Sequence, residues 1–189
     1  TVRKLERLGV SAVVINDSTW VNKNELLRND VDQIQDDIVD FCAKIKRGKN
    51  ALVSDDFMIF ARCDSLILDK GMGNAVARCK AYVESGADGI MIQSSKADGA
   101  EIMEFSKIYQ SFGAGRPLIV APLFFDKITE TELASVGVNI VIYADHMLRA
   151  AYPTMLDVAK MILTNERTFE VRKKCLSIKV ISEMITETK

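Results

Sequence analysis

Histidine is almost missing from this chain of 189 residues, which contains His146 and no other. A zinc site built from several histidines is therefore excluded, and a Ser-His-Asp triad could use only that residue. Cysteines are few, and no two of them form a C-x-x-C pair. This spacing predicts free core thiols of a cytoplasmic protein rather than zinc ligands or a disulfide framework. The cysteines are Cys42, Cys63, Cys79 and Cys175.

Long apolar runs and a one-sided charge are missing as well. No run approaches the roughly 18 apolar residues that a membrane helix needs, and no signal-peptide pattern opens the chain. The net charge is −1 with both signs mixed, which gives no electrostatic case for nucleic acid. Residues 1–10 look like the end of a helix already under way, which is odd for a natural N-terminus.

Three segments, at 7–16, 84–93 and 135–144, repeat one pattern and predict the fold. Each has a helix end, then a glycine suited to a left-handed cap, then a short apolar run. Similar apolar runs at 57–63 and 117–125 complete a series of five. The runs do not alternate with polar residues, which is typical of strands buried in a parallel sheet. We therefore predict strands near 11–16, 57–63, 89–93, 117–122 and 138–144.

Segments with helical period lie between these strands. Val31, Ile34, Ile38, Phe41 and Ile45 would share one helix face, and a helix is expected around 74–83. The C-terminal part, at 147–187, predicts further helices without strands. We therefore expect one α/β domain over 1–189, with a parallel sheet. Five strands fit either an open doubly wound sheet or part of an eight-stranded barrel.

Polar residues gather where the predicted strands end, which is where function collects in either architecture. Arg62 directly follows an apolar strand, so it needs an anion, which could be Asp64, another strand-end acid, or a ligand's carboxylate or phosphate. His146 follows the last strand and could be a base or a structural histidine. The run GMGNAV at 71–76 lacks the third glycine of a dinucleotide loop. The strand ends are Asn16-Asp17, Arg62-Cys63-Asp64, Gln93 to Lys96, Pro122 and Asp145-His146.

Two long stretches resemble a known family. DFMIFARCDSLI at 56–67 and the run from Gly71 to Ile102, together with VNIVIYADHMLRAAYPTM at 138–155, are similar to phosphoenolpyruvate mutase of the isocitrate lyase superfamily. The resemblance implies a (β/α)8 TIM-barrel fold, here about five βα units plus C-terminal helices. It also implies Mg²⁺ and a 2-oxo acid or phosphonate as substrate, interconverted between phosphoenolpyruvate and phosphonopyruvate.

The resemblance assigns roles residue by residue, with departures. Asn16 stands where the family has a glutamate around the metal, and a neutral amide holds a metal-bound water less well than a carboxylate. Asp17 beside it is a further metal candidate. Gln93, a catalytic candidate, replaces a family histidine. Arg62 matches the arginine that grips the phosphonate, as both a catalytic and a substrate-binding candidate. Asp145 stands where asparagine is usual.

The loop after the first strand carries further candidates. Asn22 replaces the family's loop lysine, and Lys23 beside it could partly substitute. Asn24 matches an asparagine along the phosphoryl path and is a catalytic and substrate-binding candidate. Glu25 replaces a serine, which puts a negative charge near an anionic substrate. These changes predict a rate lower by several orders of magnitude, because phosphoryl transfer depends on positioning and charge neutralisation.

The family's first three strands, with its main metal ligands, have no counterpart here. A five-stranded barrel cannot close alone, so we expect a longer parent protein, a homo-oligomer or a partner chain that completes the barrel. One alternative is a catalytically inactive mutase-like structural or ligand-binding domain. Others are a phosphonopyruvate hydrolase or a C–C lyase of the same superfamily. The lyase is disfavoured because its loop cysteine has no match at 22–25.

Overall fold

The computed structural model describes residues 1–18, 34–113 and 115–186. The chain forms two compact units, Thr1–Tyr143 and Ala144–Lys189, and each is described by itself. The single-domain organisation expected from the sequence stays a prediction.

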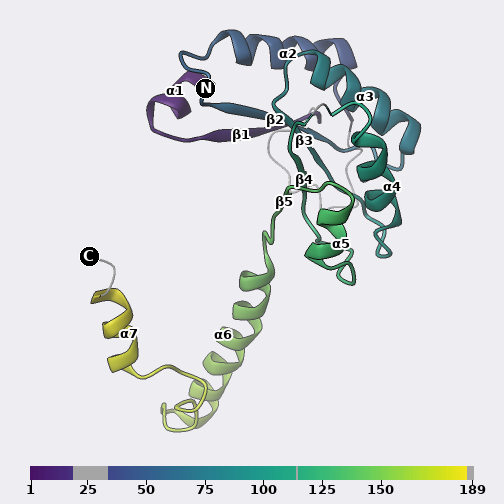
Figure 1. The fold of residues 1–189 in the computed structure, drawn as a ribbon. Coiled ribbons are helices and arrows are strands. Elements are labelled where there is room, and N and C mark those ends of the chain that lie inside the picture. Colours follow the sequence, from purple (N-terminus) through teal and green to yellow (C-terminus); the bar gives the residue numbers. More distant parts are fainter. Residues whose placement is uncertain (19–33, 114, 187–189) are drawn as a thin grey trace. The chain divides into compact units, whose positions relative to one another are not determined.

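A five-stranded parallel sheet forms the centre of the first unit (Figure 1). Its order, β1-β2-β3-β4-β5, is the order of the chain, as expected for consecutive βα units. A doubly wound sheet would reverse direction at a switch point, which this order lacks. The order therefore favours the barrel alternative. The strands are β1 (Ala12–Asn16), β2 (Met58–Cys63), β3 (Gly89–Ile92), β4 (Leu118–Val120) and β5 (Ile140–Val141).

All five predicted strands are present, but the last two are shorter than expected. β5 keeps only two residues of the predicted 138–144, since Val138 and Asn139 belong to the connection before it. Asn139 there accepts a hydrogen bond from the backbone N–H of Leu118 through its side chain. The apolar pattern could not distinguish this buried connection from a strand.

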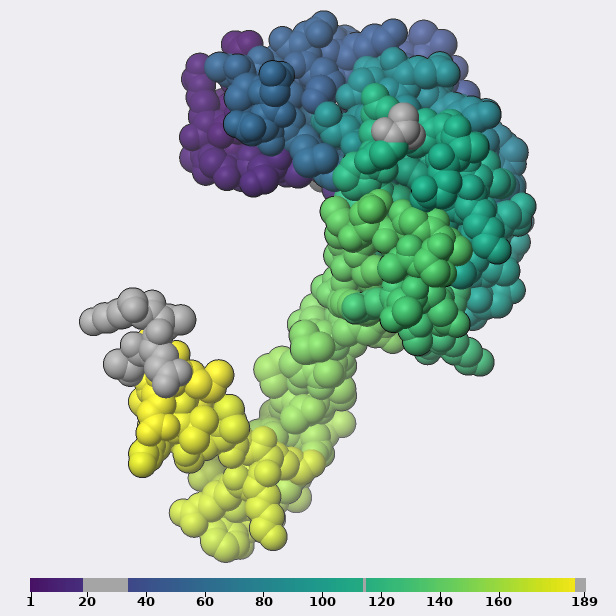
Figure 2. Space-filling view, viewed as in Figure 1, coloured from purple at the N-terminus to yellow at the C-terminus, as the bar shows by residue number. Residues whose placement is uncertain are grey.

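Helices cover one face of the sheet (Figure 1). Side chains such as Phe41, Tyr82 and Phe105 form the main core with the strand residues Ala61 and Ile90. The atoms of α2, α3 and α4 form one continuous surface in the space-filling view (Figure 2). The helices of this unit are α1 (Val2–Arg7), α2 (Ile38–Asn50), α3 (Met72–Glu84), α4 (Ala100–Tyr109) and α5 (Glu130–Ser135).

The opposite face of the sheet has a smaller apolar cluster made of strand and loop residues. Phe60, Met91, Ile119 and Ala121 form it. Side chains alternate between the two faces of a strand, so Arg62 lies on the same side as Phe60. This face is where a closed barrel would have its interior.

The start of α2 corrects one expectation. The apolar spacing places Ile34 on the helix, but α2 begins at Ile38, and Ile34 is 58% exposed. Asp37 ends the preceding extended segment because its side chain accepts a hydrogen bond from the backbone N–H of Val39, 2.7 Å away. Val31, the first member of the predicted face, lies outside the described residues.

The predicted glycine caps are confirmed. Gly9, Gly86 and Gly137 follow α1, α3 and α5, with φ of 78°, 100° and 88°. A side chain would strain this left-handed conformation, which is why the repeat carries glycine at these points.

The second unit contains the predicted C-terminal helices, α6 (His146–Asn165) and α7 (Ile178–Thr186). An ion pair between Lys174 and Asp157 links the segment after α6 back to that helix. Among the described residues, no helix is long and apolar enough to cross a membrane.

Candidate functional site

The candidate site is built on the ends of β1 and β2. Asn16 and Arg62 are register partners in the parallel ladder, in the same cross-strand row as Met91 of β3. In-register side chains of parallel strands point to the same face. The two residues that the sequence singled out are therefore neighbours on the sheet face away from the helices.

Arg62 forms the ion pair that the sequence offered as one alternative. Its Nε donates to Oδ1 of Asp64 over 2.8 Å, and the Asp64 side chain is only 1% exposed. A guanidinium carries its N–H donors in a fixed planar fork, so one bond to a carboxylate oxygen sets the direction of the whole group. The salt bridge therefore orients Arg62 and is compatible with a ligand role.

Asp64 is itself held in place by Asp17. Oδ1 of Asp17 accepts the backbone N–H of Asp64 over 3.1 Å, and Asp17 is fully buried. The backbone N–H of Asp17 donates to the carbonyl of Arg62 over 3.1 Å. These bonds join the ends of β1 and β2 into one fixed unit.

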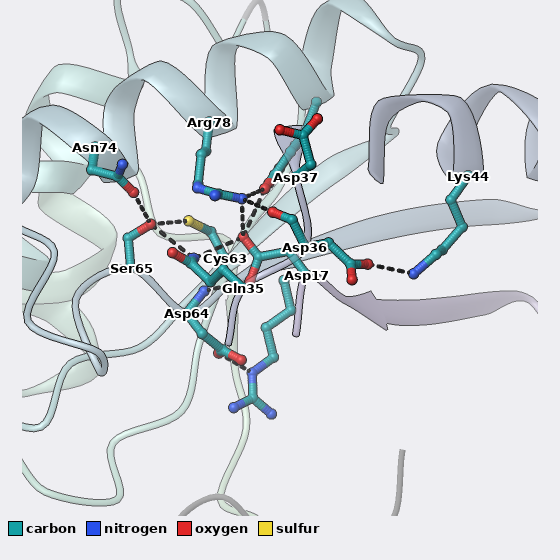
Figure 3. Close-up of polar contacts among 12 residues, drawn as sticks. Asp17, Gln35, Asp36, Asp37, Lys44, Cys63, Asp64, Ser65, Asn74 and Arg78 are labelled. Atoms are coloured by element: carbon teal, nitrogen blue, oxygen red, sulfur yellow. Dashed lines mark hydrogen bonds and ion pairs between the residues drawn. The ribbon is translucent and has the colours of Figure 1, made fainter. Parts of the chain in front are cut away.

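The second oxygen of Asp17 faces donors from α3 and from Gln35 in the segment before α2 (Figure 3). Oδ2 accepts from the Tyr82 hydroxyl at 2.7 Å and from Nε2 of Gln35 at 3.0 Å. Nη1 of Arg78 lies 3.6 Å from the same oxygen and donates to the Tyr82 hydroxyl. Burial, and then the charge of Asp17, raise the pKa of Tyr82, so its hydroxyl stays a donor.

Ser65 extends this buried network along the loop after β2. Its hydroxyl accepts from Nε2 of Gln35 and donates to Oδ1 of Asn74 over 2.8 Å. Asn74 belongs to α3, so the loop that contains Asp64 is tied to the same helix as Tyr82. The network therefore holds the strand-end loops in place from the helix side of the sheet.

Sequence reasoning missed Arg78 and Tyr82. Their signal was present, because the two polar residues stand four apart on a helix face that also carries Ala75, Cys79 and Val83. An arginine on an apolar helix face must find a buried anion. Asp17, singled out at the end of the first strand, is that anion.

Gln93 lies one residue beyond the end of β3. It is 4% exposed, and its Oε1 is buried with no hydrogen-bond partner among the described residues. A buried amide oxygen without a partner costs free energy, and such groups concentrate at functional sites. Its correspondence to the family histidine stays a prediction.

The remaining predicted residues lie either outside the described residues or in the second unit. Asn22, Lys23 and Asn24 lie outside the described residues, as does Glu25. Asp145 and His146 belong to the second unit, where Nδ1 of His146 lies 3.8 Å from Oδ1 of Asp145. This separation is longer than a hydrogen bond, so both roles considered for His146 stay predictions.

The described residues do not form a metal site by themselves. They contain no group of three His, Cys, Asp or Glu side chains placed to hold an ion. Asn16 offers a neutral amide, and both oxygens of Asp17 already accept hydrogen bonds from the protein. Mg²⁺ binds best to several carboxylate or phosphate oxygens, so these residues do not fit it alone.

Sequence comparisons with known proteins point to one enzyme superfamily. The family model for phosphoenolpyruvate phosphomutase matches residues 1–163. Phosphonopyruvate hydrolase from Variovorax sp. (strain Pal2) is 35% identical over 184 residues, which cover 97% of this chain and 62% of that protein.

Superposition on solved structures indicates the same family fold. The crystal structure of phosphoenolpyruvate phosphomutase from Streptomyces platensis subsp. rosaceus superposes with a TM-score of 0.89 at 26% identity, covering 98% of this chain and 63% of that one. A phosphonopyruvate hydrolase in complex with oxalate and Mg²⁺ has a TM-score of 0.83 at 31% identity, with 99% and 62% covered. The predicted TIM-barrel-type fold is therefore confirmed, as part of a barrel. The chain spans less than two thirds of the length of these relatives.

Proposed function

The chain belongs to the phosphoenolpyruvate phosphomutase family, and from that premise we propose that its strand-end site binds phosphonopyruvate. In the whole protein, we propose, this site interconverts phosphonopyruvate and phosphoenolpyruvate. The observation that carries the proposal is Arg62, which lies beside Asn16 on the sheet face away from the helices. A fork-shaped guanidinium matches the oxygens of a phosphonate and neutralises their charge.

The rigid support of Arg62 favours a binding role. Asp64 holds its Nε, and the buried carboxylate of Asp17 holds the backbone of Asp64. A guanidinium fixed in this way loses little freedom when it takes up an anion. Positioning and charge neutralisation are the main contributions that a protein makes to phosphoryl transfer.

Substrate contacts besides Arg62 belong to the proposal as well. Gln93 would donate a hydrogen bond where the family uses a histidine, and Asn24, Asn22 and Lys23 would line the path of the phosphoryl group. A neutral amide at Gln93 cannot supply a proton or a charge. We therefore propose a slower reaction than an intact family site would give.

Mg²⁺ belongs to the proposal only for the whole protein. A related hydrolase structure contains Mg²⁺, but the carboxylates that would hold the ion must come from outside the described residues. Asn16 would contribute at most one neutral oxygen. We also propose a cytoplasmic location and an oligomer or a partner chain that completes the barrel.

Hydrolysis of phosphonopyruvate is the second candidate function. It is supported by the 35% identity to phosphonopyruvate hydrolase. The two activities differ in product, because a mutase yields phosphoenolpyruvate and a hydrolase yields free phosphate. A third outcome, binding without turnover, is supported by the neutral residues Asn16 and Gln93.

The test identifies the product that contains the phosphorus atom of phosphonopyruvate. The protein is incubated with phosphonopyruvate and Mg²⁺, with any upstream segment restored, and ³¹P NMR follows the phosphonate signal. We expect phosphoenolpyruvate, with conversion lost in Arg62→Ala and kept in Arg47→Ala, whose exposed side chain bonds only within α2 among the described contacts. Free phosphate would identify a hydrolase. Binding of phosphonopyruvate that is unchanged in Arg62→Ala would refute the proposed site.

A further inference from the structure

A polar cavity lies at the opposite end of the sheet from the candidate site. It has a volume of about 110 Å³ and is formed by the connections that lead from α4 into β4 and from α5 into β5. These connections precede the strands, so the cavity is at the amino ends of β4 and β5. The strand-end site around Arg62 is at the carboxyl ends, and the mechanism proposed above does not use this cavity.

The polar side chains around the cavity all offer hydrogen-bond donors. They are Tyr109, Gln110, Arg116 and Asn139, and no carboxylate among the described residues lines the cavity. Nε2 of Gln110 donates one N–H to the carbonyl of Val136 over 3.3 Å and has a second N–H. The Oδ1 of Asn139 already accepts from the backbone N–H of Leu118, which leaves its amide nitrogen as the outward donor. A wall made of donors with a cation among them favours an anion.

Tyr109 supplies a buried hydroxyl. The residue is 2% exposed, and its hydroxyl has no hydrogen-bond partner among the described residues. Its ring is fixed by Phe112, with ring centroids 5.2 Å apart, and by Phe105 at 6.0 Å. Burial raises the pKa of Tyr109 to about 12, so the hydroxyl keeps its proton at neutral pH. An unsatisfied buried hydroxyl is costly unless a ligand or water completes it.

Arg116 supplies a charge that no acidic side chain of the described residues neutralises. It is partly buried, and it forms no ion pair with any acidic side chain in the described part of the chain. A neighbouring hollow shares Gln110 and Gly137 with the cavity and is lined by Lys107. Arg116 and Lys107, neither of which has a carboxylate partner in the part of the chain that the structure describes, thus flank the same donors.

Two glycines keep the cavity open. A Cβ on Gly137 would lie 1.6 Å from Nε2 of Gln110, and one on Gly113 would lie 2.7 Å from the ring of Tyr109. Side chains at these positions would collide with two of the donors. The close approach of backbone to Tyr109 and Gln110 therefore depends on glycine.

We propose that this cavity binds a small oxyanion, with Arg116 as its charge partner and Tyr109, Gln110 and Asn139 as hydrogen-bond donors. The volume exceeds the roughly 30 Å³ that one water occupies in the liquid, so it accommodates a phosphate or a carboxylate group. The site is separate from the substrate site and would stabilise the connections that enter β4 and β5 when it is filled.

The experiment uses inorganic phosphate and acetate as probes on an Arg62→Ala background, which removes the anion partner of the proposed substrate site. Calorimetric titration at constant ionic strength measures affinity. We expect Arg116→Gln to weaken phosphate binding about tenfold or more, since it removes a charge-assisted bond. Tyr109→Phe should weaken it less, and Arg47→Gln should leave it unchanged. The acetate titration distinguishes a carboxylate site from a phosphate site.

A second measurement needs no substitution. Phenylglyoxal modifies accessible arginines, and mass spectrometry reports the extent of modification at each residue. Phosphate or acetate should slow modification of Arg116 several-fold and leave Arg47 unaffected. Equal rates with and without both anions would overturn the proposal, as would affinities that are the same with and without Arg116. Because the substrate site is disabled by Arg62→Ala, failure here leaves the proposed function untouched.

Discussion

The Tyr82 hydroxyl donates to Oδ2 of Asp17 over 2.7 Å and so joins the interior of α3 to the end of β1. The other oxygen of Asp17 accepts the backbone N–H of Asp64, whose carboxylate holds Arg62. Hydrogen bonds thus run from the helix layer to a guanidinium on the far face of the sheet. The geometry of the candidate site is therefore set by the core of the protein.

Tyr82→Phe should lower the free energy of unfolding by about 1–3 kcal/mol, because it leaves the buried carboxylate of Asp17 short of a donor. Urea denaturation followed by circular dichroism measures the change. Tyr109→Phe is the matched control, because the hydroxyl of Tyr109 has no partner among the described residues. In phosphate-free buffer it should not lower the free energy of unfolding, and it should raise it to the extent that the unpartnered hydroxyl is costly. Equal losses in the two variants would contradict the role given to Tyr82.

Arg62→Lys tests whether the fork of the guanidinium matters beyond its charge. A lysine ammonium is a point charge and cannot hold Asp64 and a phosphonate in the same geometry. We expect phosphonopyruvate affinity to fall about tenfold or more, measured by calorimetric titration. Arg47→Lys, at an exposed position on α2, is the control and should bind as the parent does. Undiminished affinity in Arg62→Lys would show that charge alone suffices.

Local sequence patterns predicted the sheet well, because all five strands coincide with short apolar runs and three of them follow a glycine helix cap. Gly9, Gly86 and Gly137 mark helix ends at a fixed distance from β1, β3 and β5, and these signals lie within ten residues. The start of α2 was predicted too early, since Ile34 fits an apolar period that the Asp37 cap interrupts. An apolar spacing in the sequence can continue across a helix cap, whereas the helix itself begins only after the cap.

The candidate site was predictable only in part. Arg62 and Asn16 follow apolar runs, so their place at the strand ends could be deduced. The pairing of Asn16 with Arg62 across β1 and β2 could not be deduced, because strand pairing depends on contacts between segments more than 40 residues apart. The same holds for Tyr82, whose partner Asp17 is 65 positions away. Buried polar networks are determined by tertiary packing, which no local pattern records.

Gln93→His should restore a titratable group at the end of β3. An imidazole has an ordinary pKa of about 6.5, so its charge rises as the pH falls from 8 to 6. The affinity of the variant for phosphonopyruvate should then be higher at pH 6 than at pH 8. The ratio of these two affinities should be larger for the variant than for the parent chain. The parent is the necessary control, since the phosphonate itself titrates in this range. Identical pH profiles would place Gln93 away from the bound anion.

Burial raises the pKa of the Cys79 thiol well above its usual value. An unfolded chain ionises this thiol near pH 8.5, while the folded chain keeps it neutral. The contribution of Cys79 to stability is therefore fully present below that pH and is lost as the pH rises toward the folded-state value. A raised pKa and a fully buried sulfur both suppress reaction with electrophiles.

Iodoacetamide labelling at pH 8, read by mass spectrometry, should consequently separate the cysteines. Cys175 is exposed and should react at once, whereas Cys79 should react at least about a thousandfold more slowly, through unfolding alone. Cys175→Ala should remove the fast reaction without changing the slow one. In urea above the unfolding midpoint the two rates should converge. Rapid labelling of Cys79 in the native chain would mean that α3 opens readily, and the support that Tyr82 gives to Asp17 would then be transient.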